Sequence, residues 1–197
     1  MAVIIKKIAL LQNYRIPLKV IALVLIFSGI FYFEELLYNF AISTSVWWIE
    51  IAICLAQCLI LLLVGFSFFQ FFKYVRFPRG YYLKRAFETD RYFTFAGVKI
   101  YRFILINSFL RYANRRVYIK GRKREYIKIL YEETRQSETS HWVTIVPTLY
   151  VQILYLTNGD FPKFLYLTLF SIFFNFYPIL LQRKNRFHLE ARFKSLI

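Results

Sequence analysis

The sequence has few of the residues that break or cross-link a chain. Its 197 residues include six glycines, five prolines and two cysteines. So little glycine and proline excludes a collagen-like or low-complexity chain. Cys54 and Cys58 lie four residues apart in an apolar run, where a disulfide within one helical turn has poor geometry and two sulfurs alone make no metal site. We therefore interpret both as packing residues and predict no metal and no bound cofactor.

Common catalytic signatures are missing as well. The chain has no HEXXH, Walker or GxGxxG pattern, no HxxxxD pattern, and no nucleophile elbow around Ser137 or Ser140. Acidic residues are also scarce, with 11 Asp and Glu against 27 Lys and Arg and a net charge of +16. Such a charge in a soluble protein suggests nucleic acid. Here a hydrophobic fraction of 58% and a mean hydropathy of +0.44 indicate an anionic membrane surface first, and an anionic cosubstrate such as acyl-CoA would also fit.

Four apolar stretches have about the length of membrane spans. They are residues 16–33, 46–72, 142–157 and 164–181. Trp47 and Trp48 open the second stretch as an interfacial belt, and the turn at 158–160 joins the last two. The sequence therefore predicts an all-α integral membrane protein with about four transmembrane helices.

The positive charges predict the orientation of these spans. Residues 73–140 carry 17 Lys or Arg against 6 Asp or Glu, and both ends of the chain are basic. The positive-inside rule then places both termini and the central segment in the cytoplasm. Residues 92–110 mix apolar side chains with Lys99, Arg102 and Asn107, which favours an interfacial amphipathic helix or a re-entrant segment. Residues 122–141 read as a helix entering the membrane, and we divide the chain into regions 1–85 and 86–197.

The predicted topology gathers polar residues at one boundary. Because a short turn joins the last two spans, they should pack antiparallel, which brings His141 near Gln182, Arg183 and Asn185. Glu138 and His141 are three residues apart and share a helix face. A carboxylate beside an imidazole fixes its tautomer and raises its basicity, as a general base requires.

Other residues of this group have candidate roles. Glu133 is a second acid on the same helix and could brace Arg135 or Arg183, while Arg183 and Arg186 could hold phosphates or a developing oxyanion. Gln182 and Asn185 offer neutral hydrogen-bond donors. A non-catalytic interpretation of these residues is also open. A histidine before a tryptophan at a membrane boundary is often an interfacial residue, and basic residues after a last span usually determine membrane orientation.

Two motifs in this group resemble a known family. Residues 133–147 fit ET(K/R)xxExxHWxxxxP, and residues 182–189, preceded by Asn175, fit QRxNRxxL. Together they resemble the glycosyl-4,4'-diaponeurosporenoate acyltransferase family, small bacterial membrane enzymes of carotenoid biosynthesis, over roughly residues 87–189. Phe87 and Glu88 echo an upstream family element. Residues 98–102 depart from the family's VRKWK-like stretch, and His188 stands where the family has an arginine.

The resemblance implies a multi-pass enzyme of a bacterial cytoplasmic membrane, with 86–197 as its acyltransferase-like core. It would move a fatty-acyl group from acyl-CoA or a similar thioester to a hydroxyl of a glycosylated lipid or pigment. The implied catalytic residues are His141, Glu138 and Glu133, and the implied substrate-binding residues are Gln182, Arg183, Asn185, Arg186, Asn175 and Trp142. The alternative is a non-catalytic subunit or scaffold that docks other membrane proteins. For the basic segment, a membrane tether makes anionic lipid a simpler partner than nucleic acid.

Overall fold

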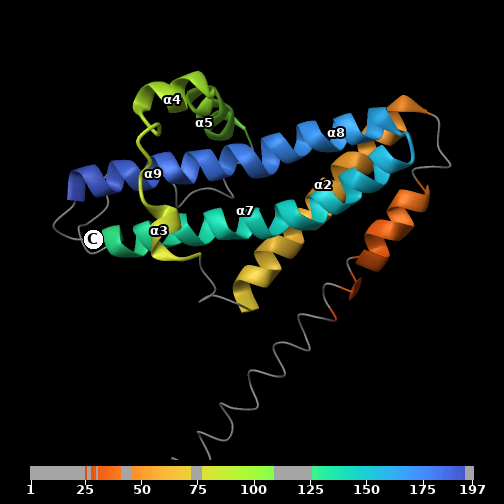
Figure 1. The fold of residues 1–197 in the computed structure, drawn as a ribbon, viewed down its shortest axis with the longest axis horizontal. Helices are drawn as coiled ribbons and strands as arrows, with labels where there is room; N and C mark the ends of the chain where they lie inside the picture. The colour runs from red at the N-terminus through yellow and green to blue at the C-terminus, as the bar shows by residue number, and fades with distance from the viewer. Residues whose placement is uncertain are drawn as a thin grey trace, which may run out of the picture.

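The computed structural model describes residues 25, 28–29, 31–40, 46–71, 77–108 and 126–193. Every regular element in these ranges is helical, which confirms the all-α prediction for the described part of the chain (Figure 1). Most of the predicted first span, 16–33, lies outside the described residues, and so do 109–125 within the basic segment and the last four residues. Residues 31–40 form a helix that precedes α2.

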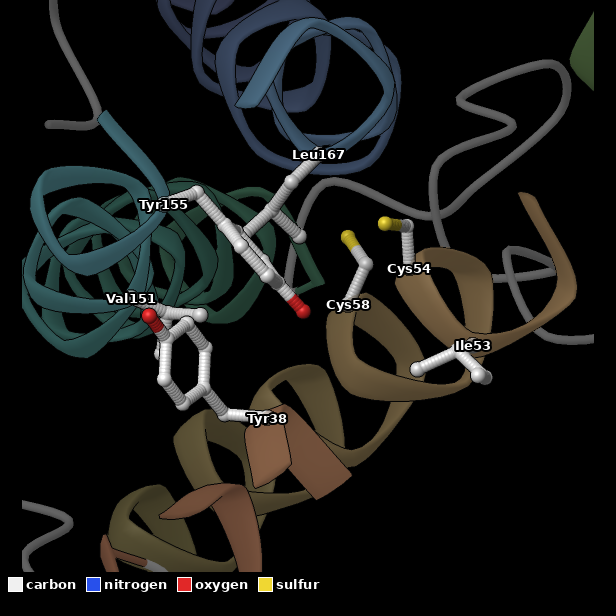
Figure 2. Packing of buried hydrophobic residues seen from close by; sticks show 7 residues of the cluster. All are labelled: Tyr38, Ile53, Cys54, Cys58, Val151, Tyr155 and Leu167. Carbon is white, nitrogen blue, oxygen red and sulfur yellow. The ribbon is translucent and has the colours of Figure 1, made fainter. Parts of the chain in front are cut away.

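Helix α2 runs from Trp47 to Phe71, within one residue at each end of the second apolar stretch, 46–72, and whether it crosses a membrane stays a prediction. Its 25 residues rise about 37 Å, which exceeds a hydrocarbon core of about 30 Å. Cys54 and Cys58 are free thiols buried on the inner face of α2. This agrees with the prediction that both are packing residues. Figure 2 shows both sulfurs on the side of α2 that faces Tyr155 and Leu167 of the neighbouring helices. Tyr38, Val151 and the α2 residue Ile53 complete the same buried cluster.

Two long antiparallel helices form the centre of the molecule (Figure 1). The first is α7, Tyr126–Thr157, whose 32 residues combine the predicted helix of 122–141 with the predicted span of 142–157. The chain then reverses at Asn158 to Asp160, where Gly159 has a φ of +73°. The second helix is built from α8, Phe161–Ser171, the π-helical turn η2, Ile172–Phe176, and α9, Tyr177–Phe193.

The π-helical turn directly precedes Tyr177 and Pro178. Proline lacks a backbone N–H and its ring crowds the carbonyl four residues earlier, which disfavours a regular α-helical turn before it. The N–H of Tyr177 instead reaches the carbonyl of Ile172, five residues back. This wider turn carries Asn175 with its side chain fully buried.

Helices α4, Asp90–Phe95, and α5, Val98–Asn107, form a third layer over α9 (Figure 1). The single turn α3, Arg79–Tyr82, precedes them and lies against α7. One helix was a candidate for residues 92–110, but the chain breaks into two at Gly97, whose φ of +75° favours glycine. Helix α5 packs against α9, while α2 packs against both α7 and α8.

One helix in the described residues, Phe161–Phe193, is long and apolar enough to cross a membrane, and Trp47–Leu63 is a shorter apolar helix. The arrangement of four spans with both termini inside stays a prediction. So does the division at residue 85. Contacts between α2 and the helices of the second region show only that the two parts pack together.

Candidate active site

A fully buried carboxylate, Glu138, lies where α7 faces α9. Its Oε1 accepts a hydrogen bond from Nη1 of Arg183 at 2.9 Å, and its Oε2 accepts one from Nη1 of Arg186 at 2.6 Å. The short turn at 158–160 makes these helices antiparallel, so residues distant in sequence meet on one level. The predicted meeting of the two polar clusters is therefore observed, with Glu138 as the point of contact.

Arg183 is held from its other side by Glu88. Its Nε donates to Glu88 Oε1 at 2.5 Å and its Nη2 donates to Oε2 at 3.0 Å, a two-pronged pair of the strong kind. Burial acts to raise the pKa of Glu88, but hydrogen bonds from Arg183 and from the backbone N–H of Arg85 outweigh it, and the net shift is downward. Glu88 is therefore ionised at neutral pH, and Arg183 is engaged by two carboxylates.

Tyr81 on α3 joins this network to Trp142. Its hydroxyl donates to Glu138 Oε1 at 2.9 Å and accepts from the indole Nε1 of Trp142 at 2.5 Å. Burial, followed by the negative charge of Glu138, raises the pKa of Tyr81 to about 12. The phenol therefore keeps its proton and remains a donor to the carboxylate at any physiological pH.

Arg186 is fully buried and only partly engaged. Its Nη1 pairs with Glu138, whereas Nε and Nη2 have no hydrogen-bond partner among the residues that the structure describes. Its guanidinium lies over the ring of Tyr82 at 5.0 Å, and that of Arg135 lies over the same ring at 4.4 Å. Buried donors of a charged group are costly to leave without an acceptor. Arg186 thus offers donors suited to a carbonyl oxygen or an anion.

His141 is buried one turn beyond Glu138 on α7. Its Nδ1 lies 3.4 Å from Oδ1 of Asn175, and Nδ2 of Asn175 in turn donates to Oγ of Ser171 at 3.5 Å. With the amide oriented in this way, its oxygen faces the ring and can accept a proton from Nδ1, which is the tautomer that leaves Nε2 as the basic nitrogen. Burial lowers the pKa of His141 to about 4, and the hydrogen bond to Asn175 opposes this shift only in part. The imidazole is neutral at pH 7.

Helix α2 approaches α7 closely beside His141. A Cβ added to the buried Gly65 would lie 2.0 Å from Oγ1 of Thr144 and 2.9 Å from the backbone oxygen of Ser140. Ser140 and Thr144 flank His141 in sequence, and their own hydrogen bond of 3.0 Å lies at this contact. Only glycine allows the two helices to come this near.

The remaining predicted residues lie on the same two helices. Gln182 and Asn185 are buried on α9, and Glu133 is half-buried on α7. Arg135 pairs with Glu132 at 3.1 Å, and the role of Glu133 in bracing an arginine stays a prediction. A role of Glu138 in orienting His141 stays a prediction.

The sequence did not predict Tyr81, Tyr82, Glu88 or Gly65 as residues of the site. Glu88 had one signal, its place in the upstream family element. No group of three His, Cys, Asp or Glu side chains in the described ranges is placed to hold a metal ion.

Comparison with known proteins identifies a family for this chain. The family model of glycosyl-4,4'-diaponeurosporenoate acyltransferase matches residues 78–195, more than half of the chain. No curated protein and no solved structure matches. The matched stretch runs from α3 to α9 and contains the network around Glu138 and the pair of His141 and Asn175, while α2 and Gly65 precede it. This chain belongs to the glycosyl-4,4'-diaponeurosporenoate acyltransferase family.

Proposed function

We propose that this protein transfers a fatty-acyl group from a thioester donor to a hydroxyl of a glycosylated carotenoid, with His141 as the general base. Membership of the family implies an acyltransferase of carotenoid glycosyl ester biosynthesis, with a glycosyl carotenoid as acceptor and an acyl donor. The observation that carries the residue assignment is the buried pair of His141 and Asn175, one helical turn from Glu138.

The proposed chemistry uses the neutral imidazole. Nε2 of His141 takes the proton of the sugar hydroxyl as its oxygen attacks the thioester carbonyl. The carbon–sulfur bond of the resulting tetrahedral intermediate then breaks, and the imidazolium returns the proton to the departing thiolate. Asn175 acts as a positioning residue, because its oxygen accepts the Nδ1 proton in both protonation states of the ring.

The negative charge of the tetrahedral intermediate needs preorganised donors. Arg186 supports this role, because two of its nitrogens are buried without a partner in the described part of the chain. Arg183 fits a different role, since Glu88 and Glu138 already take its donors. We assign Arg186 to the oxyanion or the donor carbonyl, and we assign Arg183, Glu138 and Glu88 to holding Arg186 in place. Gln182, Asn185 and Trp142 remain candidate contacts for the substrates.

The proposed reaction takes place at the cytoplasmic face of the membrane. The first part of the helix Phe161–Phe193 is apolar, and its basic residues begin at Arg183. Arg183 and Arg186 of the site therefore lie just beyond the apolar part of this helix. A lipid-embedded acceptor would then meet a water-soluble thioester at this boundary. The four spans and the orientation with both termini inside belong to this proposal.

A matched pair of histidine variants tests the assignment. His141→Gln should lower kcat by about 10²- to 10⁴-fold, the usual contribution of a general base. His188→Gln is the control, because the side chain of His188 is 55% exposed and lies near the surface residue Asp90. The assay uses the full-length protein in detergent, an acyl-CoA and a glycosylated carotenoid, with products separated by mass. Equal activity of the two variants would sink the assignment of His141.

A further inference from the structure

We propose that α4 and α5, residues 90–107 and here called the α4–α5 platform, form a docking surface for anionic phospholipid. Phosphate groups would bind to Lys99, Arg102 and Lys184, while exposed apolar side chains of α5 enter the acyl-chain boundary. This inference does not depend on the catalytic assignment.

One face of α5 explains how the platform is held to the protein. Val98, Tyr101 and Leu105, three or four residues apart on that face, are buried. Tyr101 stacks on Tyr177 with ring centroids 5.1 Å apart and meets the ring of Phe173 edge-on at 5.3 Å. These three residues are the buried ones of α5, so the packing of α5 does not bury its other apolar side chains.

A second set of apolar residues is exposed on the platform. Phe95 is 96% exposed, and Ile100 and Phe103 are each 67% exposed. Ile104 and Ile106 are exposed as well. Single exposed apolar residues are ordinary on a protein surface, but five within twelve positions (95–106) are the kind of grouping that marks an interaction site.

Cations lie among these apolar residues. Lys99 and Arg102 are exposed on α5, and Lys184 on α9 is near enough to interact electrostatically with both. Asp90 is the acid that offsets part of this charge. Three cations near one another repel, and a phosphate group placed between them relieves that repulsion. The arrangement is complementary to a negatively charged head group.

The neighbouring helix favours lipid over other anions. The platform packs against η2 and α9 in a cluster that includes Phe173, Tyr177 and Leu181. These residues belong to Phe161–Phe193, the described helix that is apolar and long enough to cross a membrane. The platform therefore lies beside the level at which this helix changes from apolar to basic. A helix with apolar and cationic side chains exposed together is typical of the membrane interface.

A charge-removal experiment with the full-length protein tests this proposal. Fluorescence anisotropy of a labelled phosphatidylglycerol is followed as detergent-purified protein is added. Each Lys or Arg near an anionic surface contributes about 1 kcal/mol, or about fivefold, so Lys99→Gln with Arg102→Gln should weaken binding roughly 25-fold. The control removes two cations elsewhere, Lys128→Gln with Arg192→Gln, which are both exposed and lie on α7 and α9 rather than on α4 or α5. Equal weakening in both double variants would overturn the proposal.

A second measurement tests the depth of α5. A spin label replacing Phe103 in proteoliposomes should collide more often with oxygen, which concentrates in lipid, than with a water-soluble nickel complex. A label replacing Lys128 gives the reference. A label at position 103 that favours the nickel complex would overturn the lipid assignment. The lipid assignment would also be overturned if the double variant Lys99→Gln with Arg102→Gln lost binding to a labelled RNA and kept its binding to phosphatidylglycerol.

Discussion

Replacing Glu138 with glutamine should destabilise the protein more than any other single carboxylate change on α7. The carboxylate is fully buried and accepts hydrogen bonds from Tyr81, Arg183 and Arg186. Glutamine has one acceptor oxygen and places its amide nitrogen against a guanidinium. Arg183 would keep the carboxylate of Glu88, whereas Arg186 would lose the carboxylate it pairs with.

Breaking a buried ion pair by removing one partner costs about 3–5 kcal/mol. A change of 1 kcal/mol shifts Tm by about 2–4 °C in a chain of this size, so Glu138→Gln should lower Tm by roughly 6–20 °C. The measurement is thermal unfolding of the detergent-solubilised protein, followed by tryptophan fluorescence. Combining Glu138→Gln with Arg186→Gln should cost less than the sum of the single changes, by about 0.5–3 kcal/mol, because both act on one network.

Glu132→Gln is the matched control for this experiment. Glu132 is on the same helix, but its side chain is 37% exposed and pairs with Arg135 across one turn. Because the carboxylate of Glu132 is partly exposed and stays in contact with water, removing its charge should cost about 1 kcal/mol, so Tm should change by no more than about 4 °C. Equal falls in Tm for Glu132→Gln and Glu138→Gln would refute the buried network.

Three further predictions follow from the site. Tyr81→Phe removes the donor to Glu138 and the acceptor for an indole, so it should cost about 1–3 kcal/mol of stability and change tryptophan emission. Gly65→Ala places a Cβ against α7 and should lower both Tm and transfer activity, whereas Gly29→Ala, with no atom within 4 Å of the added Cβ, should change neither. Because burial lowers the pKa of His141 to about 4, the acid limb of kcat/KM should lie below pH 5, and a limb near pH 6.5 would contradict the burial of the base.

Much of the helical framework was predictable from sequence. The run of apolar residues after Trp47 predicted α2 to within a residue at each end. The short turn at 158–160 predicted that the two helices it joins are antiparallel. From this constraint alone, the polar cluster that contains Glu138 was predicted to lie beside the cluster that contains Arg183 and Arg186, where the ion pairs are found. Such inferences succeed because they depend on chain connectivity and helical geometry, which a sequence displays directly.

The finer contacts were not predictable for physical reasons. Tyr81 and Glu88 reach the site from 57 and 95 residues away along the chain, through a segment with no helical periodicity to place it. Asn175 meets His141 from a π-helical turn, and the wider turn rotates the residues after it away from the 3.6-residue spacing used to assign faces. The role of Gly65 depends on a close approach of two helices, which a single glycine in an apolar run does not reveal.

The proposed transfer by His141 is tested most directly by mass spectrometry of lipids and pigments from three kinds of cell: cells that make this protein, cells that lack it, and cells that make His141→Gln. We expect one glycosylated pigment species, heavier by the mass of a fatty-acyl group, in the first cells alone. The same species in cells with His141→Gln at equal protein level, or identical profiles with and without the protein, would contradict the proposed transfer.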